Sequence, residues 1–375
     1  MEVISNDQLL VCCPIYYHEK TITMKGLLPL THMEECTLLR MMPASLRSYV
    51  PGWTTADAEI CDYSFGVITS PETTDKKGNA YTCRISQMER RERFITVLDA
   101  GTYFIHIRLK GDAKVNLMAE EDRVMSGRTI AVLYLPPGKI ISELCTGIGG
   151  SLLIRINPVI EQYAIDSHMR QLLDQARQCP HEPFLLPVVG VDFWLGAIVN
   201  LLMNNGKHKP YNQDLYSLLD RLIRLYLNEL KQDIPPDHKN KLQLQVLTGA
   251  RIGKSKLVEG SAAFIDYHHI IQYLEQHLKY NYDKREIALK SELTVKQFTR
   301  LFEDGYGKSY QDGYIELRMI QALRLTVADV KLSQIATAIG YHNFGSFSKA
   351  FRKFFGYPAS LLQWPYYNNE IHPDI

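Results

Sequence analysis

The sequence predicts a multidomain chain, with an N-terminal β-barrel or jelly roll and its packed helices followed by an all-α C-terminal domain. Three observations carry this prediction. Short apolar runs separated by Pro, Gly and Asp/Asn clusters fill residues 1–165, as in small β-barrels. Helical periodicity replaces that pattern from about residue 158, and the helical region proper is set at residues 166–234. Two pairs of short amphipathic helices, separated by a longer helical stretch, follow near the C-terminus.

Length and charge set limits on the domain organisation and on the partners. A chain of 375 residues exceeds one ordinary core, so two or three domains are expected. The formal net charge is only +1, so the overall charge does not indicate a nucleic-acid partner. Residues 267–364 carry thirteen Lys/Arg against nine Asp/Glu, a local net charge of +4.

Cysteine usage and hydropathy predict a cytoplasmic protein with no membrane partner. The seven cysteines are scattered and form no CxxC pair, so neither a disulfide framework nor a zinc site is expected. Glu2 and Asp7 interrupt the N-terminus, which therefore does not read as a secretory signal. The best apolar run, Phe193–Met203, is too short to span a membrane.

The N-terminal region, residues 1–165, is expected to be built from regularly spaced strands. The run Tyr103–Leu109 is apolar at nearly every position, as expected for a strand with both faces covered. The candidate strands are Leu9–Cys13, Phe65–Thr69, Tyr103–Leu109, Lys114–Met118, Ile130–Leu135 and Leu152–Ile156.

Residues 166–234 are expected to be helical. Val159–Ala176 reads as one helix, with Asn157 and Pro158 at its start. Phe193–Met203 and Asp214–Lys231 carry apolar stripes at helical spacing. These stripes either form a dimer interface, which makes this segment a dimerisation region, or are buried within one chain. Residues 235–264, which begin at Pro235-Pro236, are expected to be a linker.

The two C-terminal helix pairs are predicted at residues 284–305 and 331–354. In the second pair, Gly340 follows the first helix where a left-handed residue is needed, and Asn343 is an N-cap for the next helix. In the first pair, Asp283 with Glu286 and Thr294 with Gln297 read as capping boxes. A connecting helix from Tyr314 to about Val327 would hold the pairs at fixed spacing. Helical hairpins of this kind suit a helix-turn-helix that enters the DNA major groove, although an ordinary hairpin has the same pattern.

Residues 267–364 resemble the DNA-binding domain of the AraC/XylS family of bacterial transcription regulators, which implies two helix-turn-helix units within domain 265–364. Two positions depart from the family pattern. Glu292 stands at the usual turn glycine of the first unit, and Lys331 replaces the serine that caps the second. Residues 365–375 are expected to be a tail. The matching motifs are Ile287-Ala288, Phe298-x-x-Leu301-Phe302, Gly307, Tyr314-x-x-x-Arg318, Ile335-Ala336-x-x-x-Gly340-Tyr341, Phe347-Ser348-x-Ala350-Phe351-x-x-x-Phe355-Gly356 and Pro358.

The resemblance predicts how DNA would be contacted. Base-edge contacts specify sequence and phosphate contacts fix position. Arg300 falls where the family's base-reading arginine lies, and it suits a bidentate contact to guanine. Each chain would cover about two adjacent major grooves of double-stranded DNA as part of a homodimer, with RNA polymerase as the transcription target. The predicted base-reading residues are Val295, Lys296, Thr299, Arg300, Phe344, Gly345, Ser348 and Lys349, and the predicted phosphate contacts are Arg352 and Lys353.

Residues 60–165 resemble, less closely, the cupin-like sensory domain that precedes many AraC-type DNA-binding domains. That resemblance implies a small-molecule effector of unknown identity. Arg84 and the nearby Arg90, Arg91 and Arg93 form a basic cluster that could hold an anion such as a carboxylate, phosphate or nucleotide. Glu89 and Glu92 lie among these arginines, however, as on a solvated face. His106, within an apolar strand, is also typical of a satisfied core histidine. The candidate effector-binding residues are Arg84, Arg90, Arg91, Arg93, His106 and Arg108.

The sequence predicts a regulator and not an enzyme. No Gly-x-Ser-x-Gly elbow, phosphate loop or dinucleotide fingerprint is present, and the histidines do not pair as metal ligands, so no cofactor or metal is expected. The alternative is a ligand-independent DNA-binding regulator whose N-terminal half only oligomerises or binds a protein partner. A large apolar cavity would favour the sensor.

Overall fold

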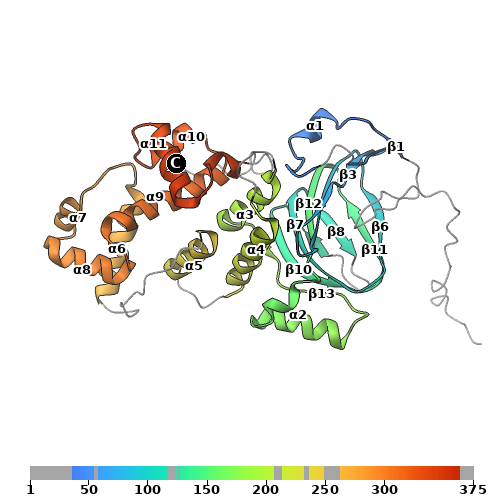
Figure 1. Cartoon of the computed structure of the whole chain (residues 1–375), viewed down its shortest axis with the longest axis horizontal. Helices are drawn as coiled ribbons and strands as arrows, with labels where there is room; N and C mark the ends of the chain where they lie inside the picture. Colours follow the sequence, from blue (N-terminus) through green and yellow to red (C-terminus); the bar gives the residue numbers. More distant parts are fainter. Residues whose placement is uncertain are drawn as a thin grey trace, which may run out of the picture.

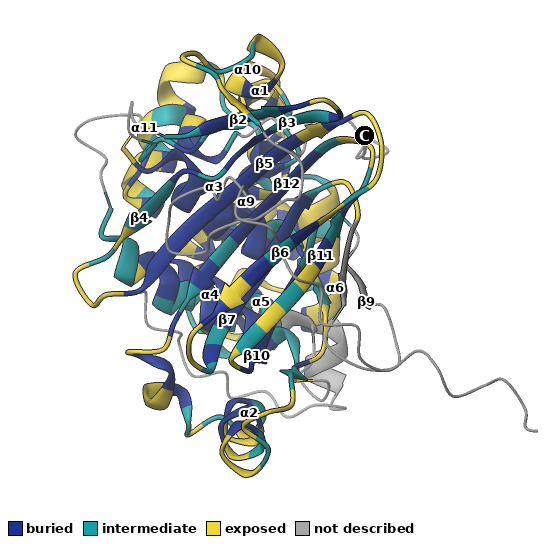
Figure 2. Ribbon diagram, turned by 90° about the vertical axis from the view of Figure 1, so that its right-hand side faces the viewer, coloured by how far each residue is buried: buried dark blue, intermediate teal, exposed yellow. Residues whose placement is uncertain are grey.

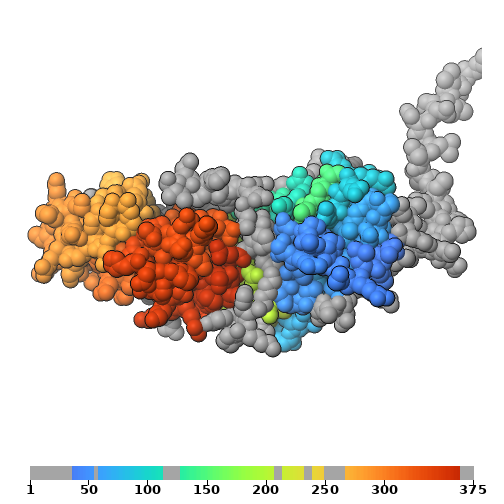
Figure 3. Space-filling model, turned by 90° about the horizontal axis from the view of Figure 1, so that it is seen from above, coloured from blue at the N-terminus to red at the C-terminus, as the bar shows by residue number. Residues whose placement is uncertain are grey.

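A computed structural model describes residues 36–54, 58–116, 123–125, 127–206, 213–231, 236–248 and 262–363. An antiparallel, sheet-rich region lies at one end of the molecule, and the C-terminal helices form the other end (Figure 1). Between them lie helices α3 (Phe193–Asn204), α4 (Leu215–Glu229) and α5 (Pro236–Thr248). Seen from above, the molecule is elongated, with the first C-terminal helix pair farthest from the sheets (Figure 3). The predicted strand Leu9–Cys13 and the predicted tail 365–375 lie outside the described residues.

Two antiparallel sheets form the N-terminal region. The larger has the strand order β1-β2-β3-β5-β12-β7-β10-β13, with β4 and β14 pairing at its sides. Its strands are β1 (Thr37–Leu38), β2 (Ile60–Tyr63), β3 (Gly66–Thr69), β4 (Glu72–Thr74), β5 (Ala80–Met88), β7 (Thr102–Lys110), β10 (Thr129–Leu135), β12 (Gly147–Arg155), β13 (Phe184–Leu185) and β14 (Val189–Gly190). The smaller sheet has the order β6-β11-β8-β9, from β6 (Glu92–Leu98), β11 (Gly138–Leu144), β8 (Ala113–Asn116) and β9 (Arg123–Met125).

The large sheet is buried on both faces, as the composition of Tyr103–Leu109 predicts. Alternate residues of β7 point to opposite sides. Ile105 and Ile107 are fully buried in the core shared with the helices, whereas Phe104 and His106 face the smaller sheet. Figure 2 shows β5 and β12 buried over most of their length, while β11 is partly exposed. The space between the two sheets is therefore enclosed by side chains from both.

The helix expected from Val159 to Ala176 is wrong in its bounds. A 3-10 turn, η1 (Ile160–Tyr163), comes first, and α2 (Ser167–Gln178) starts later, because the Asp166 side chain accepts a hydrogen bond of 3.0 Å from the N–H of His168. Asn157, the expected N-cap, instead accepts a hydrogen bond of 2.6 Å from the N–H of Tyr103 and anchors the start of β7.

Helices α3 (Phe193–Asn204) and α4 (Leu215–Glu229) cover the large sheet. Asp192 and Asp214 cap their first turns with side-chain hydrogen bonds. The apolar stripe of α4, with Leu218, Leu222 and Tyr226 fully buried, packs within the same chain. The stripe therefore gives no support to a dimer, and dimerisation through residues 166–234 stays a prediction. The first part of the expected linker forms α5 (Pro236–Thr248), whereas residues 249–261 lie outside the described part.

The C-terminal domain consists of α6 (Ala262–Gln276), two helix pairs and the helix that joins them. The first pair is α7 (Lys284–Lys290) with α8 (Val295–Tyr306), and the second is α10 (Leu332–Ala338) with α11 (Phe344–Phe355), followed by η2 (Ala359–Leu362). The connecting helix α9 (Tyr310–Val327) begins four residues before its predicted start at Tyr314, because Ser309 caps it by accepting from the N–H of Asp312.

The two helix pairs belong to different cores. The N-terminal half of α9 packs with α6 and the first pair through Tyr310, Tyr314 and Leu317. Its C-terminal half packs with the second pair, and that core is continuous with α3, α4 and the large sheet. The second pair is therefore joined to the N-terminal region, while the first pair projects away from it (Figure 1).

Among the described residues, no helix combines the length and apolar character needed to span a membrane. Across the same residues, no group of three or more His, Cys, Asp or Glu side chains is placed to hold a metal ion.

Candidate functional site

Each helix of the first pair begins with a capping box, and both boxes are as predicted. The Asp283 side chain accepts from the N–H groups of Arg285 and Glu286, and the Glu286 side chain accepts from the N–H of Asp283. Thr294 and Gln297 make the same reciprocal bonds at the start of α8. These bonds satisfy N–H groups that a helix start would otherwise leave unpaired, and so they fix where α8 begins.

Glu292, between α7 and α8, adopts a left-handed conformation at the position where the resemblance places a turn glycine. Its φ is 55°, in the region that a residue with a Cβ occupies only at a cost of about 1 kcal/mol. The turn nevertheless forms, because the N–H of Leu293 bonds to the main-chain oxygen of Ala288 at 2.9 Å. The departure from glycine is thus tolerated at the expense of local stability.

The turn of the second pair requires its glycine. Gly340 has φ 81°, and a Cβ there would lie 2.8 Å from the main-chain oxygen of Lys279 and from the Arg318 guanidinium. Asn343 accepts a hydrogen bond of 2.8 Å from the N–H of Ser346 and starts α11. Lys331, at the start of α10, makes no side-chain cap, so the missing serine is not replaced by an equivalent bond.

Arg318 lies where the two pairs meet. Its guanidinium donates to the main-chain oxygen of Tyr280 at 3.0 Å and sits 4.5 Å from the ring centre of Tyr314 and 5.9 Å from that of Tyr341. Tyr314 belongs to the core of the first pair, and Tyr341 packs against the core of the second. Arg318 therefore helps to fix one pair relative to the other.

The residues predicted to contact DNA lie on the outer surfaces of α8 and α11. Arg300 is the most prominent, because its side chain is 87% exposed, with Asp304 at 3.7 Å as a loose partner. Thr299 and Ser348 are half-buried, and the Thr299 hydroxyl bonds to the main-chain oxygen of Val295 at 2.7 Å. The exposed members of the predicted set are Val295, Lys296, Arg300, Phe344, Gly345, Lys349, Arg352 and Lys353.

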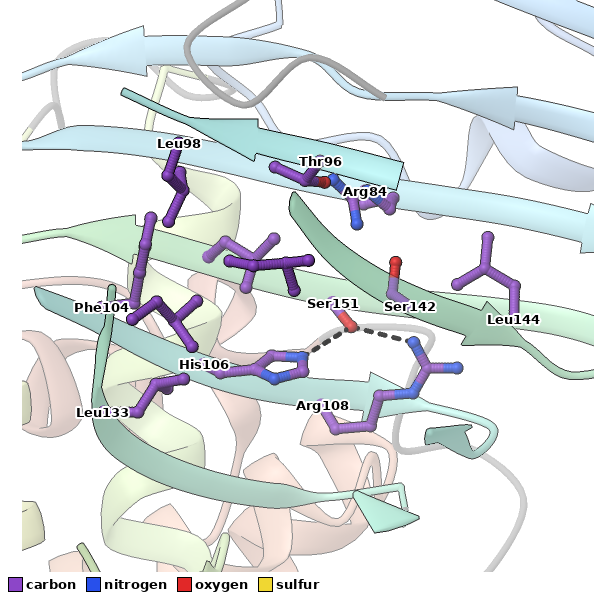
Figure 4. Close-up of a pocket in the computed structure, with 13 residues that line it drawn as sticks. Arg84, Thr96, Leu98, Phe104, His106, Arg108, Leu133, Ser142, Leu144 and Ser151 are labelled. Atoms are coloured by element: carbon purple, nitrogen blue, oxygen red, sulfur yellow. Dashed lines mark hydrogen bonds between the residues drawn. The ribbon is translucent and has the colours of Figure 1, made fainter. Parts of the chain in front are cut away.

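A cavity of about 80 Å³ lies between the two sheets (Figure 4). One end is apolar and the other carries two arginines, and no aspartate or glutamate stands among the described residues that line it. Those thirteen residues are Arg84, Thr96, Leu98, Phe104, His106, Arg108, Leu133, Leu135, Ile140, Ser142, Leu144, Ser151 and Leu153.

The cationic end is buried and polarised. Arg108 donates hydrogen bonds of 2.8 Å to the Ser151 hydroxyl and to the main-chain oxygens of Gly111 and Asp112. His106 Nε2 lies 3.1 Å from the same hydroxyl. Burial, followed by the charge of Arg108, lowers the pKa of Arg84 to about 10. Burial and the charges of Arg108 and Arg84 lower the pKa of His106 to about 3, so this imidazole is neutral.

Only some of the predicted effector-binding residues come together. Arg84, His106 and Arg108 line the cavity. Arg90 and Arg93 are exposed and pair with Glu92 and Glu143, and Arg91 is also exposed. The basic cluster is thus divided, because β5 points Arg84 inward whereas the following turn and β6 place the other three on the surface.

Sequence reasoning missed the serines of the cavity and its apolar wall. Ser142 on β11 and Ser151 on β12 are separated in sequence from the arginines. Strand pairing places Ser151 beside Arg108, whereas Ser142 reaches the cavity because the smaller sheet packs on the larger one. The alternation of side chains along a strand could have predicted part of the cavity, because it places Phe104, His106 and Arg108 on the same face of β7.

The helix-turn-helix domain family matches residues 287–363 of the chain. A probable transcriptional regulator of Photobacterium leiognathi, LumQ, is 28% identical over 151 residues. The match covers 38% of this chain and 59% of the length of that protein.

Solved structures give more distant likenesses. The C-terminal domain of AraT, a response regulator from Geobacillus stearothermophilus, is 20% identical with a TM-score of 0.27, over 30% of this chain and 98% of that one. ToxT from Vibrio cholerae is 12% identical with a TM-score of 0.26, over 76% of this chain and 99% of that one. These structural likenesses are too remote to transfer a ligand or a partner.

Proposed function

We propose that this chain, whose C-terminal part is an AraC-type helix-turn-helix domain, is a sequence-specific DNA-binding transcription regulator controlled by a small molecule held between its two sheets. The observation that carries the DNA-binding proposal is the display of exposed cationic side chains on two capped helices, α8 and α11, attached to the ends of one connecting helix. Such an arrangement can present both helices to one duplex.

Both helix pairs act as helix-turn-helix units in this proposal, with α8 and α11 in successive major grooves about 34 Å apart. Arg300 reads guanine through a bidentate contact. In the second unit Phe344 contacts a thymine methyl group, Ser348 and Lys349 contact bases or phosphates, and Arg352 and Lys353 hold phosphates. Because the second set is poorer in bidentate donors, the first unit dominates specificity. A homodimer would place two such sites on the promoter and act on RNA polymerase.

The sensory part of the proposal is supported by the cavity and its route to the second unit. β7 and β10 line the cavity with one face and pack against the helices with the other. The Asn200 side chain of α3 donates to the main-chain oxygen of Leu362, and Asn204 donates to that of Leu361 at 2.8 Å. A change between the sheets can therefore reach the second helix-turn-helix unit through α3.

The large apolar cavity that would favour the sensor is not found, because the space between the sheets is small and cationic at one end. What favours the sensor over the ligand-independent alternative is the pair of buried arginines that face this space.

Selection from random duplex DNA tests the DNA-binding proposal. The full-length protein is expected to enrich one motif, and Arg300→Ala is expected to weaken binding to that motif more than binding to unrelated DNA. The matched control is Arg285→Ala, which changes an exposed arginine on α7 and should leave the selected motif unchanged. If no motif is enriched, or if both variants lose the same discrimination, the proposal is wrong.

A further inference from the structure

We infer that the cavity between the sheets binds an organic anion with an apolar body, and that its carboxylate lies between Arg84 and Arg108. This ligand class deepens the sensory part of the proposed function and rests on it only for the effect on DNA.

The first step of the argument is the state of Arg84. Its side chain is buried, with 8% of the residue exposed. Among the described residues its guanidinium makes no hydrogen bond, and the Nε atom is fully enclosed without an acceptor. Burial and the charge of Arg108 lower the pKa of Arg84 by more than the charge of Glu72 raises it. A buried cation without a hydrogen-bonded counter-charge is costly, and no described residue that lines the cavity is an aspartate or glutamate, so a bound anion would relieve this cost.

The second step is the geometry of the other polar groups. Arg108 is 3% exposed, and the acceptors described above for its guanidinium are neutral. The Ser142 hydroxyl is buried with no partner in the described part of the chain. Figure 4 shows Ser142 and Ser151 between the two arginines. A carboxylate placed there would accept charge-assisted hydrogen bonds from both guanidinium groups and from Ser142.

The third step concerns the body of the ligand. Away from the arginines the wall consists of Leu98, Phe104 and Leu133, together with other aliphatic side chains. A sugar or nucleotide would bury hydroxyl or amide groups against this wall without partners. His106 is neutral and adds no positive charge to those of the two arginines. About 80 Å³ holds a few water-sized groups, which is enough for the carboxylate and the first carbons of an aliphatic acid, and the rest of a longer chain would extend through the open side of the cavity.

Calorimetric titration of the full-length protein with octanoate and with 1-octanol tests the inference. The two ligands share an apolar chain, and only octanoate carries the charge. Octanoate is expected to bind at least tenfold more tightly. Arg84→Met should weaken octanoate at least tenfold while leaving 1-octanol unchanged, and Arg84→Lys, which keeps the charge, should retain more of the affinity. The control Arg91→Gln removes an exposed arginine outside the cavity and should change neither affinity.

The melting temperature gives an independent readout that does not require DNA. Without ligand, Arg84→Met should melt at a higher temperature than the natural protein, because it removes an uncompensated buried charge. With octanoate only the natural protein and Arg91→Gln should gain melting temperature. Equal binding of octanoate and 1-octanol, no octanoate binding, or unchanged octanoate affinity in Arg84→Met would overturn the inference. If octanoate binds through Arg84 but leaves DNA affinity unchanged, the ligand site stands and the effector control in the proposed function fails.

Discussion

Asn204 of α3 donates a hydrogen bond of 2.8 Å to the main-chain oxygen of Leu361, 157 positions later in the chain. Asn200, one turn earlier on the same helix, does the same for Leu362. Both asparagines are buried, so these bonds satisfy carbonyl groups at the end of the second helix pair that water does not reach. The N-terminal region and the second pair therefore share both a core and two buried hydrogen bonds.

Replacing both asparagines by alanine is expected to separate the two regions. Each change leaves a buried carbonyl group without its donor, at a cost of about 1–3 kcal/mol. Differential scanning calorimetry should show one transition for these regions in the natural protein and two in the double variant. Asn205→Ala is the control, because within the described part of the chain the Asn205 side chain bonds locally, to the main chain of Gln213. If the control splits the transition equally, or if the double variant still unfolds in one step, the hydrogen bonds do not join the regions.

Arg300→Ala is expected to lose more discrimination between the selected DNA motif and its single-base variants than Lys349→Ala. A bidentate contact to guanine is worth about 1–3 kcal/mol of discrimination, whereas a lysine contact to phosphate carries none. Equilibrium binding at one fixed salt concentration measures the difference. Equal losses from the two variants would mean that both pairs read bases equally.

Glu292→Gly is expected to stabilise the first helix pair by about 1 kcal/mol, because glycine occupies the left-handed region without a Cβ clash. Urea unfolding measures the change. The matched variant Glu292→Ala removes the same carboxylate but keeps a Cβ, so it should bring no comparable gain. A similar gain from alanine would assign the effect to charge and not to backbone conformation.

Asp192→Asn is expected to stabilise the protein at pH 7.5 but not near pH 4. Burial, with a contribution from Glu229, raises the pKa of Asp192 to about 6, although the N–H of Leu195 opposes the shift. The folded state thus holds this proton more tightly than the unfolded chain does. Its stability falls as pH rises from about 4 to about 6 and stays lower above that range. The neutral asparagine avoids this loss, on the order of 1–3 kcal/mol.

The control for that prediction is Asp214→Asn, at the equivalent cap of α4. Burial alone would raise the pKa of Asp214, but hydrogen bonds from Lys76 and Ser217 outweigh it and lower the pKa. The pKa shift of Asp214 is therefore opposite in sign to that of Asp192. Its ionised form stabilises the folded state, so Asp214→Asn should lose stability at pH 7.5. Urea unfolding at the two pH values measures both variants. If the two substitutions change stability in the same direction at pH 7.5, burial does not distinguish the caps.

Local signals predicted the C-terminal domain well because its helix boundaries depend on neighbouring residues. The capping pairs Asp283/Glu286 and Thr294/Gln297 and the turn at Gly340 all lie within a few positions of the helices they bound. The left-handed conformation of Glu292 occurs where the family resemblance, and not a local signal, places a turn glycine. The start of α9 was missed because the cap at Ser309 lies outside the apolar stripe that defined the helix.

The cavity could not be assembled from the sequence, because its members meet through long-range strand pairing and through the packing of one sheet on the other. Arg84 and Ser151 are register partners on β5 and β12, although 67 positions separate them. Arg84 was grouped with Arg90, Arg91 and Arg93 by proximity in sequence, yet the turn after β5 and the start of β6 place the latter three outside. The small-sheet strands β6 and β11 were not among the predicted strands, and without them the cavity has no second wall.

Methylation interference on the selected DNA motif tests the central claim most directly, because it reports guanine N7 contacts in the major groove. Two patches about 10 bp apart on one face of the duplex are expected for each protein chain. Arg300→Ala should erase one patch and leave the other. A single patch, or two patches that both survive this substitution, would contradict the account of two helix-turn-helix units reading successive grooves.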